Sequence, residues 1–266
     1  MSSHSNFSLP PFEFNHFSSY NLIVACVGVG NVAQLACDLL IYNLGCNIVS
    51  NLNFEYCPSV IGNNPYQTSE NVQSLMTTSQ ICANPELQLA VLQIRAPPFD
   101  GCKRKHVKEL VNFLESAKFK TVVLLSSSFA SILKDEELNA EPLQYALSSS
   151  FCISDRKRFE ELNWFPLKAY NDHSECKLSA TYYLPGCGVA TYLYDELLKN
   201  EGISVCLLNL FTSEGDNSGD ALYVVRRLDD WLQLTAQREV KKPSFHWSAP
   251  PSWSCLFGSD PINELY

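Results

Sequence analysis

Apolar runs alternate with amphipathic stretches along most of this chain. Residues 21–27 form an apolar run that contains β-branched residues, and this run predicts a buried strand. Beyond a turn that contains two glycines, apolar residues recur with helical spacing at Val32, Leu35, Ala36, Leu39 and Leu40. Asn31 is placed to cap this helix and Gly45 to end it. The pattern therefore predicts a strand, a glycine turn and a helix in succession.

Two further units of the same kind follow. Strands are expected at 46–50, 87–94 and 121–125, and the last two flank a helix with an apolar face at Val107, Leu110, Val111 and Leu114. This β-α-β order predicts a right-handed parallel crossover. Later in the chain, a helix at 189–199, a strand at 203–211 and a helix at 218–235 repeat the alternation. The expected fold class is α/β: a single domain with a mostly parallel central sheet and helices on both faces, an α/β/α sandwich.

The pattern also divides the chain. Residues 1–242 are expected to form the α/β domain, with 1–20 allowed to be flexible, and residues 243–266 a tail rich in proline and aromatic residues that packs on the domain or on a partner. The polar region 126–175 is expected to be an insertion or a lid, with helical pieces near 143–147 and 156–162. The loop 57–66 mixes turn formers with apolar residues and is expected to be ordered.

Charge and cysteine content narrow the possible functions. The chain has 266 residues and a net charge of −9, which argues against a surface that tracks nucleic-acid phosphates. The basic cluster 103–106 with Lys108 is more typical of a solvated helix face than of a binding patch. Its 11 cysteines include no C-x-x-C pair, so they are expected to be free thiols in a reducing compartment. Without a signal peptide or a membrane-spanning run, a cytoplasmic or nuclear protein is expected.

The glycine turn is the first candidate for chemistry. The stretch from Gly28 and Gly30 to Ala33 resembles a dinucleotide-binding turn and could serve a nicotinamide-dependent oxidoreductase. Such a site needs an acidic residue after the second strand, where the sequence has Asn51, Leu52 and Asn53. A glycine turn that simply lets a packed helix leave a central strand is the favoured interpretation.

Three other segments could carry chemistry, and for each a structural role is favoured. Ser126, Ser127 and Ser128 follow a strand and could supply a hydrolase nucleophile, but G-x-S-x-G is missing and turn or cap donors are favoured. The oxygen-rich segment 214–217 could bind a cation, but capping of the next helix is favoured. The segment 185–188 is expected to be a tight turn into a helix. The sequence therefore predicts no catalytic, cofactor-binding or metal-binding residues, and no enzyme.

Several short motifs together resemble the proteasome assembly chaperone 2 family. The resemblance extends from about Leu22 to the C-terminus, and the motifs occur in the same order. The motifs are residues 30–36 together with 38–40; 62–66; 92–95; 123–128; 214–217; and 252–253 together with 256–258. The resemblance implies a non-enzymatic chaperone that needs no cofactor. It would form a heterodimer with proteasome assembly chaperone 1, escort proteasome α subunits into the α ring of the 20S core particle, and prevent their premature or wrong association.

The resemblance also draws attention to the C-terminus. In this family, tails can enter pockets between α subunits through an ending in which tyrosine is the penultimate residue, whereas this chain ends Glu264-Leu265-Tyr266. A terminal aromatic ring and carboxylate beside Leu265 have the composition of a partner-binding anchor. A frayed end is an alternative that the sequence supports equally well.

Overall fold

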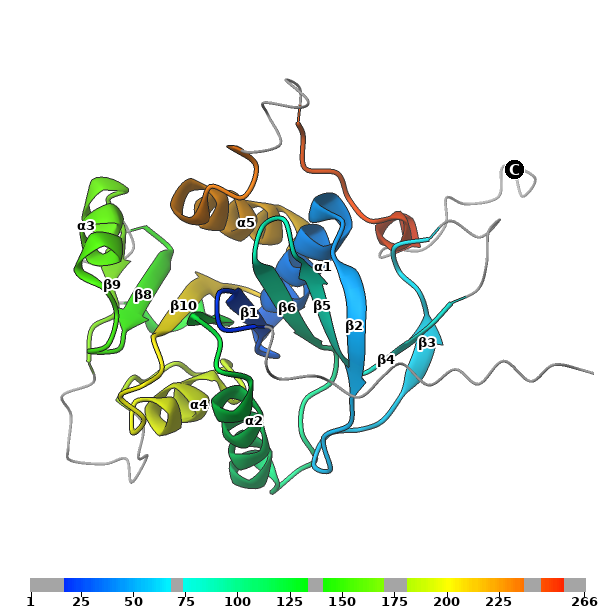
Figure 1. Cartoon of the computed structure of the whole chain (residues 1–266), viewed down its shortest axis with the longest axis horizontal. Coiled ribbons are helices and arrows are strands. Elements are labelled where there is room, and N and C mark those ends of the chain that lie inside the picture. Colours follow the sequence, from blue (N-terminus) through cyan, green and yellow to red (C-terminus); the bar gives the residue numbers. More distant parts are fainter. Residues whose placement is uncertain (1–16, 68–73, 134–140, 170–180, 237–244, 256–266) are drawn as a thin grey trace, which may run out of the picture.

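An eight-stranded sheet forms the centre of the molecule (Figure 1). This computed structural model describes residues 17–67, 74–133, 141–169, 181–236 and 245–255. The strands of the main sheet are β1 (Asn21–Ala25), β2 (Asn47–Leu52), β5 (Ser79–Asn84), β6 (Leu89–Ile94), β7 (Thr121–Phe129), β8 (Leu143–Leu147), β9 (Phe165–Pro166) and β10 (Val205–Thr212). A separate two-stranded ribbon consists of β3 (Ile61–Asn63) and β4 (Leu75–Thr77).

The strand order of the main sheet is β2-β5-β6-β1-β7-β10-β8-β9. Strands β6, β1, β7 and β10 run parallel at its centre, and they are apolar on both faces because helices cover both. On one side β5 pairs antiparallel with β6, and β2 pairs antiparallel with β5; on the other side β8 pairs antiparallel with β10 and parallel with the short strand β9. The predicted parallel sheet is therefore confirmed at its centre.

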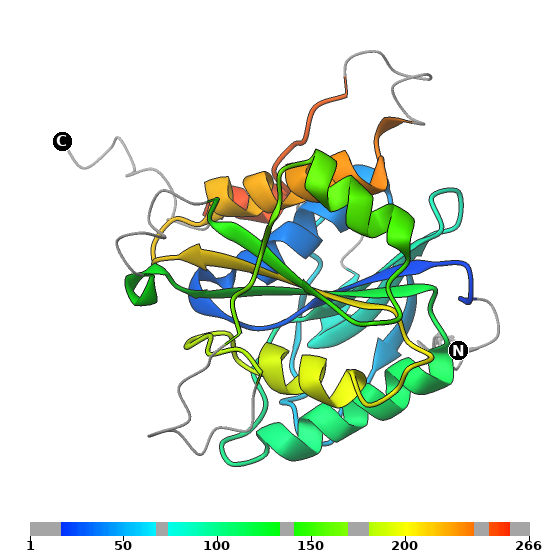
Figure 2. The same ribbon diagram turned by 90° about the vertical axis from the view of Figure 1, so that its left-hand side faces the viewer.

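Helices cover the two faces of the sheet (Figure 2). Helices α1 (Val32–Leu44), α3 (Ile153–Glu161) and α5 (Ser218–Leu232) pack on one face, and α2 (Lys103–Ala117) and α4 (Ala190–Leu197) pack on the other. Three short 3-10 helices, η2 (Val29–Asn31), η3 (Ala130–Ile132) and η4 (Pro251–Cys255), complete the described elements. The predicted fold class, an α/β domain with helices on both faces, is confirmed.

The region between β7 and α4 differs from the prediction. Residues 143–147 form strand β8 rather than a helical piece, whereas the helix predicted near 156–162 is present as α3. In its described part, this region adds β8, β9 and α3 at the edge of the sheet. Strand β5 was not predicted, and its six buried residues lie between β6 and the edge strand β2.

The cysteines that the sequence places in core elements are buried. Cys26, Cys37 and Cys206 are buried free thiols, and burial raises the pKa of each of them. They therefore behave as small hydrophobic residues. Among the described residues, no helix combines the length and apolar character needed to cross a bilayer.

Candidate functional site

The glycine turn after β1 is filled by another part of the chain. Gly30 has a φ of 62°, and a Cβ atom built on it would lie 2.2 Å from Oδ1 of Asn217, at the start of α5. The glycine therefore makes room for this asparagine side chain. Asn31 has a φ of 52° and makes no side-chain capping bond, so the prediction that it caps α1 is wrong. Gly45 does end α1, with a φ of 63° and an N–H donated to the carbonyl of Ile41.

The same turn is closed on its other sides. A Cβ atom on Gly186, which has a φ of 89°, would lie 2.4 Å from Cγ2 of Val29, so the 185–188 turn packs directly on the glycine turn. The Ser127 hydroxyl donates a 2.6 Å hydrogen bond to the Val29 carbonyl. A pyrophosphate would need the space beside Gly30 that the Asn217 side chain occupies. The geometry favours the packing role over the cofactor role.

The three serines lie within a strand rather than after one. Ser126, Ser127 and Ser128 are buried residues of β7, which continues to Phe129. Ser128 accepts a 2.7 Å hydrogen bond from Nδ2 of Asn209 on β10. The Ser127 hydroxyl thus binds a backbone carbonyl and the Ser128 hydroxyl binds an asparagine, and neither of these partners is a histidine. The geometry does not support a nucleophile activated by a base.

The segment 214–217 joins β10 to α5. The carboxylate of Asp216 accepts hydrogen bonds from the Ser218 hydroxyl and N–H, at 2.6 and 3.0 Å, and these bonds lower the pKa of Asp216. Asn217 Nδ2 donates to the Asp220 carboxylate at 2.8 Å. Capping by Asp216 is as predicted, although Asn217 binds Asp220 instead of a backbone N–H. Within the described ranges, no group of three histidine, cysteine, aspartate or glutamate residues is placed to hold a metal ion.

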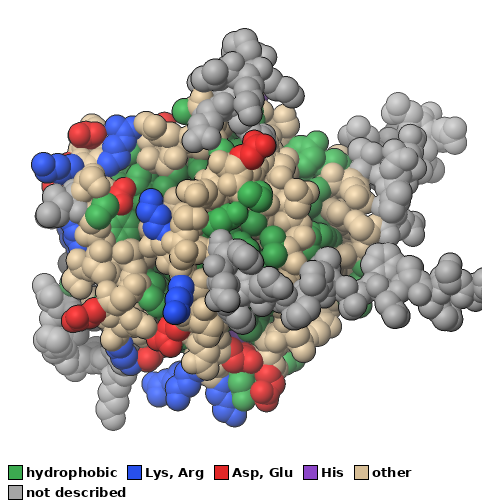
Figure 3. All heavy atoms as spheres, in the orientation of Figure 1, with side chains coloured by type: hydrophobic (Ala, Val, Ile, Leu, Met, Phe, Trp, Pro, Cys, Tyr) green, Lys and Arg blue, Asp and Glu red, His purple; other side chains and the backbone are tan. Residues whose placement is uncertain are grey.

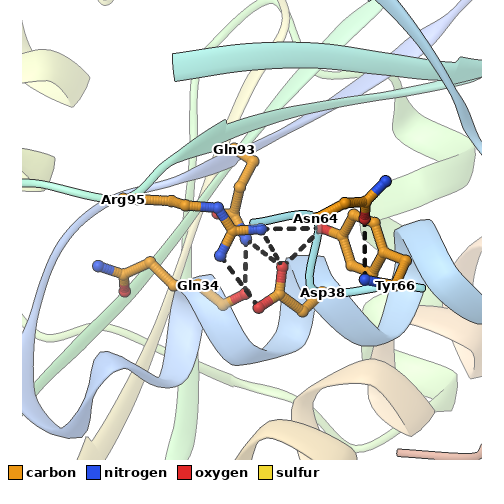
Figure 4. Close-up of polar contacts among 6 residues, drawn as sticks. All are labelled: Gln34, Asp38, Asn64, Tyr66, Gln93 and Arg95. Carbon is orange, nitrogen blue, oxygen red and sulfur yellow. Dashed lines mark hydrogen bonds and ion pairs between the residues drawn. The ribbon is translucent and has the colours of Figure 1, made fainter. Parts of the chain in front are cut away.

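A buried polar cluster brings three of the sequence motifs together (Figure 4). Asp38 of α1 is 5 % exposed and accepts hydrogen bonds from the Tyr66 hydroxyl at 2.6 Å and from Gln93 Nε2 at 2.8 Å. Arg95, which directly follows β6, binds both oxygens of this carboxylate, at 2.7 and 3.2 Å, and also reaches the Tyr66 hydroxyl at 3.1 Å. We call Asp38, Tyr66, Gln93 and Arg95 the Asp38 cluster.

The electrostatics of the Asp38 cluster favour one fixed charge state. Burial raises the pKa of Tyr66, and the neighbouring carboxylate raises it further. For Arg95, burial alone would lower the pKa, but the attraction and hydrogen bonds of Asp38 and Tyr66 together outweigh burial and raise it. A neutral phenol and a paired guanidinium are poor proton donors at neutral pH. The cluster is thus suited to holding segments together and unsuited to acid–base chemistry.

The Asp38 cluster anchors the segment that follows β3. Asn64 Oδ1 accepts a hydrogen bond from the Tyr66 N–H, and Asn64 Nδ2 donates to Ser74 Oγ at the start of β4, so both strands of the ribbon are tied to this segment. The C-terminal segment lies against the same place, because the Ser252 N–H donates to the Pro65 carbonyl at 3.2 Å. Segments that are far apart in the sequence therefore meet beside α1.

The described part of the predicted tail packs on the domain. Phe245, Trp247 and Trp253 contact the core between the sheet and helices α1 and α5. Asn43 of α1 forms two 2.8 Å hydrogen bonds with the backbone of Ser248. The predicted anchor residues Glu264, Leu265 and Tyr266 lie outside the described residues.

The ribbon formed by β3 and β4 presents apolar side chains to solvent. Val60, Ile61 and Leu75 are 59, 66 and 61 % exposed, more than any other large hydrophobic residue that the structure describes. Ile61 lies opposite Thr77, and Leu75 opposite Asn63, so these side chains share the outer face of the ribbon. Val60 and Ile61, two apolar residues of the loop 57–66, therefore do not anchor it in the core.

A cavity lies beside the ribbon. It has a volume of about 300 Å³ and is lined by residues 51–54, 57–61 and 77–79, none of which is charged. In Figure 3, lysine and arginine side chains lie together with acidic ones at the lower edge, over α2. We call Val60, Ile61 and Leu75 with this cavity the ribbon surface. Its only signal in the sequence is an apolar pair next to turn-forming residues.

The basic cluster lies on the outer side of α2. Lys103, Arg104, Lys105 and Lys108 are exposed, while His106 points inward and is buried. Burial lowers the pKa of His106, against the opposing influence of Glu109, so the ring is held neutral in the core. Lys105 lies over the ring of Tyr56, with 5.3 Å between Nζ and the ring centre.

Comparison with known sequences identifies relatives over nearly the whole chain. The model of the PAC2 family matches residues 22–234. A protein named proteasome assembly chaperone 2 from Danio rerio is 38 % identical over 252 residues, which cover 91 % of this chain and 93 % of that protein. The protein of the same name from Homo sapiens is 32 % identical over 250 residues, with the same coverage of both chains.

Solved structures share the fold at low sequence identity. A protein of unknown function from Thermoplasma acidophilum superposes with a TM-score of 0.60 at 15 % identity, covering 86 % of this chain and 88 % of that chain. Pyrococcus furiosus PbaA, described as an archaeal homologue of proteasome-assembly chaperone, has a TM-score of 0.54 at 16 % identity and covers 90 % of this chain and 96 % of its own. These similarities support the α/β architecture.

Proposed function

The chain belongs to the PAC2 family, and from this premise we propose that it is a chaperone for assembly of the 20S proteasome. In this proposal it forms a heterodimer with proteasome assembly chaperone 1, promotes formation of the α ring and prevents off-pathway association of α subunits. Its partners are this chaperone and the proteasome α subunits, in the cytoplasm and nucleus. It is not an enzyme and uses no cofactor.

One observation carries the proposal. Relatives named proteasome assembly chaperone 2 are 38 and 32 % identical over 91 % of the chain, so the similarity extends over the whole α/β domain. The sites of the described region agree with a binding role, because the Asp38 cluster is a structural network and the ribbon surface is apolar and exposed. Exposed apolar surface of this kind is typical of proteins that bind other proteins.

The oxidoreductase alternative has less support. The side chain of Asn217 occupies the space beside Gly30, and the segment after β2 supplies Asn53 where a ribose-binding acid is needed. The serines of β7 likewise give little support to a hydrolase, since their hydroxyls bind Val29 and Asn209.

The proposal can be tested by native affinity purification of the tagged chain from its own cells. We expect mass spectrometry to identify proteasome assembly chaperone 1 and proteasome α subunits among the retained proteins, without mature proteolytic subunits. A matched purification with a tagged unrelated acidic protein controls for retention by charge alone. Recovery of the chain with neither partner would contradict the proposal, and cofactor binding would then be the next measurement.

A further inference from the structure

We propose that the ribbon surface is where a partner protein adds an extended, uncharged segment to the free edge of β3. The inference rests on the proposed function, and it specifies which face of this chain its permanent partner covers. All three residues of β3 are exposed, so nothing in the described part of the chain covers this strand.

The backbone of β3 has hydrogen-bonding groups to offer. The Asn64 N–H donates to the Ser74 carbonyl, and pairs in an antiparallel ladder alternate between bonded and non-bonded. The N–H and C=O groups of Ile61 and Asn63 therefore point away from β4. The ribbon has only two strands, so within the described residues no third strand uses these groups. A free edge of this kind is a template for an added strand.

The side chains around this edge determine the chemistry of the occupant. Ile61 and Leu75 share the outer face, and the adjacent cavity of about 300 Å³ is lined by uncharged residues only. Charged residues make up 18 % of the chain, and their depletion here is the composition expected at the centre of a protein interface. The complementary segment would carry aliphatic or aromatic side chains and no charge, with one side chain in the cavity.

A permanent partner fits this surface better than a transient client. An aliphatic strand edge that is left open promotes aggregation, and proteins usually protect such edges with charge, proline or a covering segment. The residues of β3, Ile61, Gly62 and Asn63, supply neither charge nor proline. Lasting cover by a partner chain solves this problem, whereas an α subunit that must be released would leave the edge open again. We therefore assign the surface to the heterodimer partner.

The Asp38 cluster prepares the ribbon for this contact. Tyr66 is three residues beyond β3 and is held by Asp38 and Arg95, while Met76, on the inner face of β4, is 3 % exposed. The ribbon is thus fixed to the domain before the partner arrives, which lowers the entropy lost on binding.

The test uses the full chain and its complex with proteasome assembly chaperone 1. Hydrogen–deuterium exchange should show the amides of Ile61 and Asn63 exchanging rapidly in the free chain and protected in the complex. Asn63→Pro removes one outward N–H, and Asn63→Ala is its matched control because it keeps that N–H. Proline is tolerated on an edge strand, and we expect Asn63→Pro to weaken the complex about tenfold, with Asn63→Ala close to wild type.

A second pair of variants tests the apolar face. Ile61→Glu would bury a charge in the interface, and we expect it to weaken the complex by more than about tenfold. Phe165→Glu is the control, because Phe165 is also exposed but lies in β9, an edge strand of the main sheet and not of the ribbon. The melting curves of all variants establish that they are folded.

The outcomes separate this inference from the function on which it rests. If the wild-type complex forms but the two amides are not protected, the ribbon surface is not the interface and the proposed function stands. Equal binding by Asn63→Pro and Asn63→Ala would lead to the same conclusion. If the two wild-type chains do not associate, the proposed heterodimer is wrong and this inference is overturned with it.

Discussion

The carboxylate of Asp38 accepts hydrogen bonds from the side chains of Tyr66, Gln93 and Arg95. We expect Asp38→Asn to lower the free energy of unfolding by about 3 kcal/mol, at the lower end for a broken buried pair because the side chain of Arg95 is 29 % exposed. Urea denaturation measures this change. Glu196→Gln, which breaks the exposed pair with Lys199, is the control, with an expected cost of less than about 1 kcal/mol. Equal effects of the two variants would contradict a structural role for the Asp38 cluster.

The contact between Gly30 and Asn217 makes a prediction about coupling. Gly30→Ala forces an alanine into a left-handed conformation and against the asparagine side chain. We therefore expect it to lower the free energy of unfolding by more than about 2 kcal/mol. Asn217→Gly should remove the steric part, and the double variant should then lose less than the sum of the single losses. Gly219→Ala is the control, because Gly219 is exposed in α5 with open space around it. We expect this variant to raise the free energy of unfolding by about 0.5–1 kcal/mol. Additive losses in urea denaturation would show that Asn217 does not fill the turn.

The elements with a clear period could be predicted from the sequence. Helices α1, α2, α4 and α5 and the central parallel strands have apolar residues at regular spacing, because each element buries one stripe or both faces in the core. Strand β8 has only five residues, in which Leu143, Tyr145 and Leu147 alternate toward the core that contains α3, and Tyr145 packs on Phe159 of α3 with ring centres 4.8 Å apart. Three alternating apolar positions in so short a segment do not distinguish a strand from a piece of helix.

The sites depend on which elements become neighbours, and the sequence shows this only in part. The residues 38, 62–66 and 92–95 belong to the motifs that carry the family resemblance, but their meeting follows from the position of β6 beside β1 and from the path of the chain over α1. Burial of Ile61 could not be judged from composition either. An apolar residue beside turn formers can point into the core or out of it, and the register with β4 decides between them.

Charge is distributed unevenly over the whole molecule. A net charge of −9 is of the kind that favours solubility, while the cavity of the ribbon surface is lined by uncharged residues, and Lys103, Lys105 and Lys108 are exposed on α2. In a protein that binds others, this separation lets one face be covered for long periods while charged faces remain hydrated. The Asp38 cluster links the two requirements, because it fixes an apolar ribbon to an otherwise well-packed domain.

The C-terminal residues Leu265 and Tyr266 lead to a prediction for the assembled complex. If the tail is an anchor for α subunits, its deletion should weaken α-subunit binding by about 2 kcal/mol, or roughly 30-fold, and leave the heterodimer intact. Native mass spectrometry of the heterodimer titrated with α subunits measures both effects. A single glycine added after Tyr266 keeps both side chains and moves only the carboxylate. If this variant loses as much affinity for α subunits as the deletion does, the terminal carboxylate is the group that supplies the anchoring contact. Unchanged affinity after deletion would mean that the body of the chaperone supplies the contact by itself, and an intramolecular tail contact would then add nothing to it.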